Sequence, residues 1–264
     1  SGIQDVVKFL RVQEETGQMP VPVINGMLEK SAFVRRLREI GERYANRDAL
    51  IIVDSDCIWS KEWVLEARDM LASSSRYARF RIVFQSDARQ TCTLLRQHPD
   101  LQDELGIEGI LLLQLKPWHP FTLGLWMSDC FLKDNPQDMK LIEQATGNWP
   151  GLLYRLHEKA RQTPHQLKQH VEEFQKEILR PEVVRQILGE FGIEREEDFK
   201  VFQYLAMDNG REEDIAQHYQ LPVELVRSVL SAAELLGTAH RIGKGYWKAN
   251  PLVAKLVLEA GDPA

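Results

Sequence analysis

The sequence has few cysteines. Its three thiols, Cys57, Cys92 and Cys130, lie far apart in a chain of 264 residues and form no CxxC pair. This spacing argues against a disulfide framework and against a zinc site, and it suits reduced thiols in a cytosolic protein. No apolar run approaches the roughly 20 residues that cross a bilayer, and the first residues lack the basic and apolar regions of a signal peptide. We therefore expect a cytoplasmic protein without a membrane partner.

Positive charge is not in excess either. The chain carries 33 Lys and Arg against 39 Asp and Glu, a formal net charge of −6. Its overall field therefore does not attract polyanions such as nucleic acids, and only a local basic patch would do so. Hydrophobic residues make up 44% and charged residues 27% of the chain, which is ordinary for a globular protein. Its length allows two compact domains, or one large domain with an appendage.

The most informative stretch is an uncharged run that ends in acids. Residues 49–53 read ALIIV, and Asp54 and Asp56 follow one residue apart. A buried strand that ends in carboxylates can hold a metal-bound phosphate at a sheet edge, with one acid on magnesium through water and the other on a hydrolytic water. The same residues also fit a polar turn that leads into a helix capped by Ser60. The run by itself does not decide between these two interpretations.

Two further apolar runs complete an alternating pattern. Residues 80–84, FRIVF, predict a strand that ends in the polar trio Gln85, Ser86 and Asp87, and residues 110–115 predict a third strand. Helices between the strands favour a parallel sheet with crossover helices, which would bring the trio to the same carboxyl edge as the two acids. A polar turn is again the plainer alternative. The other expected elements are helices at 3–13, 31–44, 60–71 and around Leu94, and a short edge strand or extended segment at 19–24.

The rest of the chain is predicted to be mostly helical. From residue 121 to 191, helical runs are separated by Pro or Gly breaks. Residues 195–264 then read as a small unit of three helices and a hairpin with the turn Gly243-Lys244-Gly245, which is the plan of a winged helix. The expected helices are 121–132, 137–146, 150–161, 164–179, 181–191, 196–207, 211–218 and 223–236, and the expected hairpin strands are 238–242 and 246–249.

Four segments, in this order, resemble a family of ATPases. DALIIVDSD (48–56) looks like a Walker B strand, and FRIVFQSD (80–87) looks like the sensor strand that follows it. ILLLQLKPW (110–118) looks like the third conserved segment of the signal-transduction ATPases with numerous domains (STAND), which are related to the AAA+ ATPases. GNWPGLLYRL (147–156) is similar to the family's Gly-x-Pro motif, in which a proline lies beside adenine and opens a lid helix. The resemblance covers nearly the whole chain, including a winged helix after the lid.

The resemblance implies roles for individual residues. It implies a Walker B pair that handles magnesium and water, a sensor trio, and a lid segment near adenine. The corresponding residues are Asp54 and Asp56; Gln85, Ser86 and Asp87; and Gly147, Trp149 and Pro150.

Three arginines are candidates for a finger or a sensor. Arg76 and Arg79 precede the second strand, where related ATPases place an arginine finger that points to a neighbouring subunit. Arg155 stands where a lid would carry a sensor arginine. The alternatives are solvent-facing arginines at a helix end for the first two, and a surface position on an amphipathic helix for Arg155.

The phosphate-binding loop of this family is the main departure. A P-loop needs GxxxxGK[ST], because backbone amides cradle the phosphates, lysine reaches the terminal ones and the hydroxyl binds magnesium. The sequence contains no such motif, and on the best alignment Gln4, Asp5 and Val6 replace its glycine, lysine and hydroxyl residue. A negative charge in place of the lysine repels phosphates. We therefore expect that the loop has decayed or lies upstream, and that the chain as given hydrolyses nucleotide poorly.

The predicted winged helix is a weak candidate for DNA binding. Residues 195–264 carry 8 Lys and Arg against 11 Asp and Glu, whereas DNA binding needs several phosphate contacts. The clustered cations are Arg241, Lys244 and Lys248, on the hairpin. A structural or protein-binding winged helix fits this charge better.

These observations predict an α/β parallel-sheet domain of the P-loop NTPase type over 1–118, an all-α helical lid over 119–194 and a winged-helix domain over 195–264. We expect a regulatory or assembly module of a STAND/AAA+ type ATPase that acts by protein contacts, with the sheet edge and the winged helix facing partner chains. No cofactor is expected for the chain alone. If a P-loop is supplied, we expect ATP and magnesium to bind. The alternatives are an ATP-hydrolysing fragment whose P-loop lies outside the chain, and a DNA-binding regulator.

Overall fold

Two compact units make up the chain, and the boundary between them falls inside a helix. The computed structural model describes residues 21–26, 29–54, 59–98, 101, 106, 117–129, 136–161 and 166–261. The first unit comprises Gly2–Gln90 and the second comprises Thr91–Ala264. The helix expected at 3–13, the residues in place of a P-loop, Asp56 and the strand expected at 110–115 lie outside the described residues.

A parallel sheet forms the centre of the first unit. Its described strands are β1 (Val23–Ile24), β2 (Ala49–Val53) and β3 (Phe80–Phe84), in the order β1-β2-β3. β2 and β3 run in parallel with Val53 opposite Phe84 at the end of the pairing, and β1 joins the other side of β2. The predicted strands at 49–53 and 80–84 and the short edge strand are therefore confirmed, and so is the parallel pairing.

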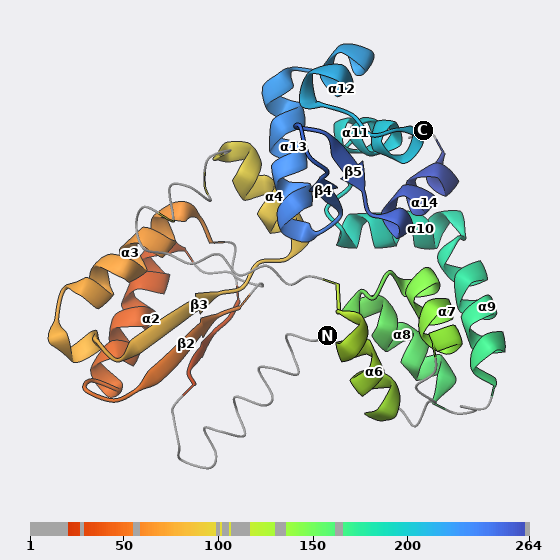
Figure 1. Cartoon of the computed structure of the whole chain (residues 1–264). Coiled ribbons are helices and arrows are strands. Elements are labelled where there is room, and N and C mark those ends of the chain that lie inside the picture. The colour runs from red at the N-terminus through yellow and green to blue at the C-terminus, as the bar shows by residue number, and fades with distance from the viewer. Residues whose placement is uncertain are drawn as a thin grey trace. The chain divides into compact units, whose positions relative to one another are not determined.

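Two helices cover one face of this sheet. They are α2 (Lys30–Arg43) and α3 (Lys61–Ala72), each of which crosses from one strand to the next (Figure 1). Phe33 of α2 stacks on Trp63 of α3 with 4.5 Å between ring centroids and lies 5.9 Å from Phe84 of β3. Burial of large side chains such as Phe33 stabilises the layer by about 1.5–3 kcal/mol each. A 3-10 turn, η1 (Ser75–Tyr77), then leads into β3.

Helix α4 (Ala88–Gln97) follows β3 and contains the boundary between the units, since Gln90 belongs to the first and Thr91 to the second. One face of α4 is apolar and buried, with Cys92, Leu94 and Leu95. This helix was expected around Leu94, and its existence is confirmed.

The remainder of the second unit is helical, as the sequence predicts. No helix among the described residues is long and apolar enough to cross a membrane. A continuous apolar core runs from Leu123 to Val257 and joins the predicted lid with the C-terminal elements. The helices are α6 (Pro120–Asp129), α7 (Pro136–Thr146), α8 (Pro150–Ala160), α9 (Leu167–Ile178), α10 (Pro181–Glu190), α11 (Glu196–Met207), α12 (Glu212–Tyr219) and α13 (Val223–Leu236).

A two-stranded hairpin follows α13. Its strands, β4 (Ala239–Arg241) and β5 (Trp247–Ala249), pair in antiparallel register around the expected turn. The turn uses three consecutive positive φ angles, 70° at Gly243, 47° at Lys244 and 79° at Gly245.

The sequence analysis missed the last helix, α14 (Pro251–Ala260). Its start carries a clear signal, because the Asn250 side chain accepts a hydrogen bond from the Leu252 amide at 3.0 Å and Pro251 occupies the first helical position.

Candidate functional site

The carboxyl ends of β1, β2 and β3 lie in register. The Asp54 amide donates to the Ile24 carbonyl at 2.8 Å, and the Gln85 amide donates to the Val53 carbonyl at 2.9 Å. Because Val53 pairs with Phe84, Asp54 and Gln85 are the next residues along two adjacent strands. The structure thus brings the Walker B-like acid and the first sensor-like residue to one edge of the sheet, where open α/β sheets bind their ligands.

Gln85 is held by its backbone, whereas its side-chain oxygen has no partner in the described part of the chain. The indole Nε1 of Trp59 donates to the Gln85 carbonyl at 2.6 Å, and Gln90 Nε2 donates to the Trp59 carbonyl at 3.3 Å. Gln85 Oε1 is buried and accepts no hydrogen bond from the residues that the structure describes. A buried acceptor without a donor costs about 1–3 kcal/mol, and such groups are found where a structure is organised for something other than stability.

Asp87 and Ser86 have local structural contacts. The Asp87 carboxylate accepts the Gln90 amide at 2.7 Å, so it caps the N-terminus of α4. The Ser86 hydroxyl donates to the Asp87 carbonyl at 3.1 Å. The polar-turn interpretation therefore describes Asp87 well, whereas it leaves the carboxamide of Gln85 unexplained.

Of the two Walker B-like acids, only Asp54 belongs to the residues that the structure describes, because Asp56 lies outside them. Among the residues that are described, no three His, Cys, Asp or Glu side chains gather as a ligand set for a metal ion. A magnesium ion in a phosphate site is usually held by one or two carboxylates together with phosphate oxygens and waters. Asp54 fits such a role by its donor chemistry, with the remaining ligands supplied from elsewhere.

The candidate arginines take part in surface contacts. Arg79 pairs with Asp48, its Nε donating to Oδ1 at 3.0 Å, and Arg155 pairs with Glu190 on α10. Arg76 lies in η1, and its backbone amide donates to the Ser74 hydroxyl at 3.3 Å. Exposed pairs of this kind contribute about 0–1 kcal/mol, so they do not hold the arginines firmly in place.

The lid segment is a tight turn before α8. Gly147 and Asn148 have φ angles of 56° and 59°, and the Trp149 amide donates to the Thr146 carbonyl at 3.1 Å. A Cβ on Gly147 would lie 3.1 Å from Trp149 and 3.3 Å from Leu252, which is a tight approach, and the positive φ also favours glycine. Pro150 opens α8, as the resemblance implies.

Trp149 packs inwards in this turn. Its ring lies 4.8 Å from that of Phe191, while its Nε1 and the Oδ1 of Asn148 are buried without hydrogen-bond partners among the described residues. The turn therefore holds two unsatisfied polar atoms at the start of α8. The two residues directly precede Pro150, and the resemblance implies that this proline lies near adenine.

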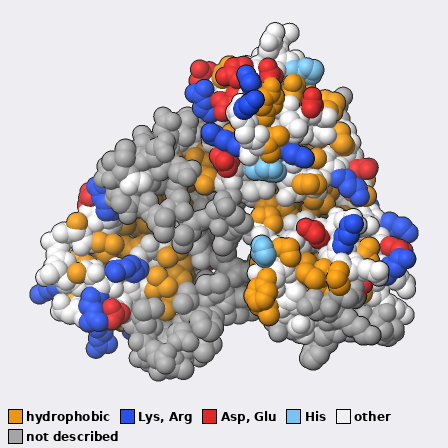
Figure 2. Space-filling model, in the orientation of Figure 1, with side chains coloured by type: hydrophobic (Ala, Val, Ile, Leu, Met, Phe, Trp, Pro, Cys, Tyr) orange, Lys and Arg blue, Asp and Glu red, His pale blue; other side chains and the backbone are white. Residues whose placement is uncertain are grey.

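The hairpin cations are partly engaged. Arg241 lies over the Trp247 ring at 4.7 Å and 3.6 Å from Glu234. Lys244 and Lys248 make no ion pair among the described residues. Figure 2 shows acidic and basic side chains side by side over the α12 end of the second unit, rather than a uniformly basic surface.

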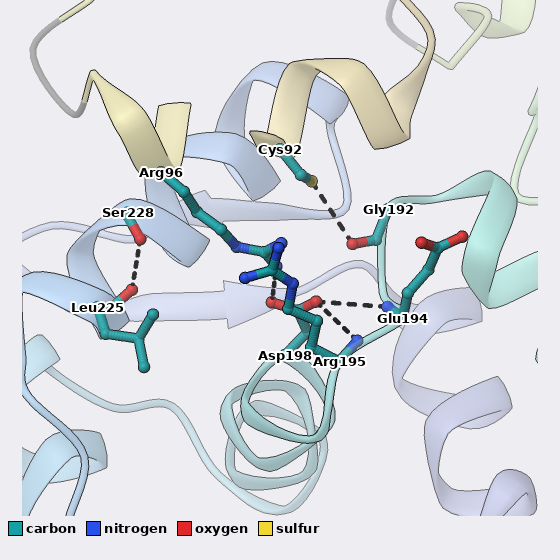
Figure 3. A network of polar contacts seen from close by, with 8 residues as sticks. All are labelled: Cys92, Arg96, Gly192, Glu194, Arg195, Asp198, Leu225 and Ser228. Atoms are coloured by element: carbon teal, nitrogen blue, oxygen red, sulfur yellow. Dashed lines mark hydrogen bonds and ion pairs between the residues drawn. The ribbon is translucent and has the colours of Figure 1, made fainter. Parts of the chain in front are cut away.

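Sequence reasoning missed a buried ion pair. Arg96 of α4 pairs with Asp198 in the first turn of α11, with side-chain exposures of 15% and 3% (Figure 3). The second Asp198 oxygen accepts the amides of Arg195 at 3.0 Å and Glu194 at 3.3 Å. Nearby, the Cys92 thiol donates to the Gly192 carbonyl at 3.5 Å. The segment Arg-Glu-Glu-Asp at 195–198 occurs again at 211–214 and opens a helix each time, so the sequence marks the helix start but not the ion pair.

Burial raises the pKa of the Cys92 thiol to about 12, and the negative charge of Asp198 adds to this effect. Cys92 therefore stays protonated at neutral pH, which suits a packing role.

Comparison with known proteins gives one informative likeness. No protein-family model and no curated protein matches the chain. A solved structure, the Walker-type ATPase PABY2304 of Pyrococcus abyssi, is similar with a TM-score of 0.57 at 15% sequence identity, over 88% of this chain and 68% of that chain. At this identity the likeness shows the fold alone: the chain shares the fold of a P-loop ATPase, with an α/β sheet domain and helices.

Proposed function

We propose that this chain is a regulatory or assembly module of a STAND- or AAA+-type ATPase, and that it acts by contacts with other protein chains or domains of that assembly. The observation that carries the proposal is the register of β2 and β3, because it sets Asp54 beside Gln85 at the carboxyl edge in a fold shared with a Walker-type ATPase. The printed sequence contains no GxxxxGK[ST] to cradle the phosphates that this edge would handle.

The proposal assigns the parts of the chain as the sequence suggests. Residues 1–118 form the P-loop NTPase-type domain, residues 119–194 a helical lid, and residues 195–264 a winged helix. Three helices and a hairpin, α11 to β5, support the last assignment. The sheet edge and the winged helix are the surfaces that we assign to partners.

A hydrolysis assay tests the proposal. The chain alone with Mg·ATP is expected to release phosphate no faster than the Asp54→Asn variant. Turnover that is clearly above this background, and that Asp54→Asn removes, would contradict a non-hydrolysing module.

A second candidate is an ATP-binding and hydrolysing fragment that works with a P-loop outside the printed sequence; phosphate release that appears only when such a loop is supplied, and that Asp54→Asn removes, would support it. The unsatisfied Oε1 of Gln85 beside Asp54 favours this candidate, since a sensor amide needs an unused hydrogen-bonding atom at the edge. In that case Asp54 would hold magnesium through water, and the segment at Pro150 would lie near adenine.

DNA binding is disfavoured by the contacts of the basic side chains. Arg227, on the helix that would enter the major groove, pairs with Glu212 at 2.9 Å, and this hydrogen bond raises the pKa of Arg227. Arg241 is also engaged. Only a strong, salt-sensitive gel shift that Lys244→Glu abolishes would restore the DNA-binding alternative.

A further inference from the structure

We propose that α4 is a latch: the Arg96–Asp198 ion pair fastens its last turn to the start of α11, and release of this pair transmits a change at the carboxyl edge of the sheet to the C-terminal helices. The latch deepens the proposed regulatory function, on which it rests for the meaning of the signal. The evidence for the latch itself is independent of nucleotide binding.

Helix α4 lies outside the main apolar core. The continuous core of the second unit begins at Leu123 and includes none of the buried apolar residues of α4, Cys92, Leu94 and Leu95. A narrow gap lies between Cys92 and side chains of α13 such as Val229. An element beside the core, rather than inside it, can detach by local opening without global unfolding.

A buried polar contact holds α4 in place. The Arg96 guanidinium crosses to Asp198, whose carboxylate also accepts the two backbone amides that precede α11 (Figure 3). Because Asp198 is almost completely buried, loss of Arg96 leaves its negative charge without a cation, and removal of one partner from a buried pair is strongly destabilising. The ion pair therefore controls whether α4 stays docked.

The chain repeats the helix start of α11 at α12, where the aspartate makes no ion pair with α4 in the described part of the chain. Arg195 to Asp198 and Arg211 to Asp214 are identical in sequence, and in each the aspartate accepts the backbone amide of the arginine, as the N3 residue of a capping box does. Asp214 is exposed, whereas Asp198 is buried and also binds Arg96. Asp214 is thus a matched control that shares the capping role of Asp198 and lacks its contact with α4.

Helix α4 begins at the candidate site. Asp87 caps its first turn and follows Gln85 by two residues, while Arg96 lies in its last turn. A group that binds at Gln85 or displaces Asp87 therefore acts on the same helix that Arg96 fastens. The two ends of α4 are coupled if the helix docks and detaches as one element.

Thiol labelling of Cys92 reports the latch directly. Cys92 is buried in the docked helix and reacts only when α4 opens. We would measure its modification by iodoacetamide under native conditions, using peptide mass spectrometry to separate it from Cys57 and Cys130. The variants are Arg96→Gln and Asp198→Asn, with Arg96→Lys as the conservative replacement. The controls are Asp214→Asn for the capping box and Arg79→Gln for loss of a surface arginine.

The latch predicts that Arg96→Gln and Asp198→Asn speed labelling of Cys92 on the order of 10–100-fold. Arg96→Lys is expected to restore much of the protection, and both controls to stay within about 2-fold of wild type. Asp87→Ala, at the other end of α4, should speed labelling about 5-fold through loss of the cap. Wild-type amide exchange in α4 should also be faster than in α13, a measurement that needs no variant.

Two results would overturn the latch. One is labelling in Arg96→Gln that equals that in Arg79→Gln, and the other is an Asp87→Ala variant in which Cys92 stays fully protected. None of these measurements uses nucleotide, so failure of the latch leaves the proposed function standing. Conversely, ATP turnover by the chain would contradict the proposed function and leave the latch standing.

Discussion

Gln85 and Asp54 are neighbours across two parallel strands, although they lie 31 positions apart in the sequence. Their amides donate to Val53 and to Ile24, so three strand ends are tied together at this edge. The backbone amides of both residues are paired, whereas the Gln85 side-chain oxygen is buried without a donor from the described residues. This combination of a fixed backbone and an unsatisfied side chain underlies the first prediction.

Gln85→Met is expected to raise the free energy of unfolding by about 1 kcal/mol, because it replaces a side chain whose buried oxygen has no donor among the described residues with an apolar group of similar volume. Urea unfolding followed by tryptophan fluorescence measures this change. Ile51→Ala, in the centre of β2, is the control and should lower the unfolding free energy by about 2–5 kcal/mol. A clear loss of stability in Gln85→Met would mean that the amide makes an essential contact.

The sequence was sufficient to predict most of the architecture. The run at 49–53 is uncharged and ends in acids, and the structure places it as β2 between two parallel neighbours. Helices α7, α8 and α10 begin with proline, and Gly147 and Gly237 follow α7 and α13, all of which can be recognised in the sequence. Local signals of this kind do not depend on tertiary contacts, which is why they predict well.

The contacts between distant segments could not be predicted. Nothing in the sequence around Arg96 indicates a partner 102 positions later, because a buried pair is created by packing of α4 on the start of α11. Asp87 was expected as a sensor, and its structural role as a helix cap follows from its place before α4. The repeated Arg-Glu-Glu-Asp segment marks both helix starts, but only burial distinguishes Asp198 from Asp214.

Two glycines of the second unit should respond in opposite ways to alanine. A Cβ on Gly210 would lie 2.4 Å from the Tyr204 ring, at a backbone that exchanges hydrogen bonds with Trp247. Gly210→Ala should therefore lower the unfolding free energy by about 1–3 kcal/mol. Gly151 lies in the first turn of α8 with open space around it, so Gly151→Ala should raise stability by about 0.5–1 kcal/mol. Denaturant midpoints compare the two, and equal effects would contradict the packing at Gly210.

Stability should fall at high pH through Cys92. Its pKa is raised from 9.0 to about 12 in the folded chain. Above pH 9 the unfolded chain therefore loses the thiol proton while the folded chain keeps it. The Cys92 contribution is complete below pH 9 and is lost as the pH rises towards 12, by up to about 1.4 kcal/mol per pH unit.

Urea unfolding at pH 8 and pH 10 measures this dependence. Lysines and tyrosines also titrate in this range, so the relevant quantity is the difference between wild type and Cys92→Ala. The wild type should lose more stability than the variant. An identical loss in both would show that the thiol is not buried as described.

The central claim is that this chain retains the edge of an ATPase site and lacks the phosphate cradle. Isothermal titration calorimetry with ATP and magnesium, on wild type and Asp54→Asn, tests it most directly. The account predicts no heat beyond dilution for either protein up to roughly 1 mM nucleotide, which corresponds to a binding free energy weaker than about −4 kcal/mol. Saturable wild-type binding with a Kd on the order of 10 μM, lost in Asp54→Asn, would contradict it.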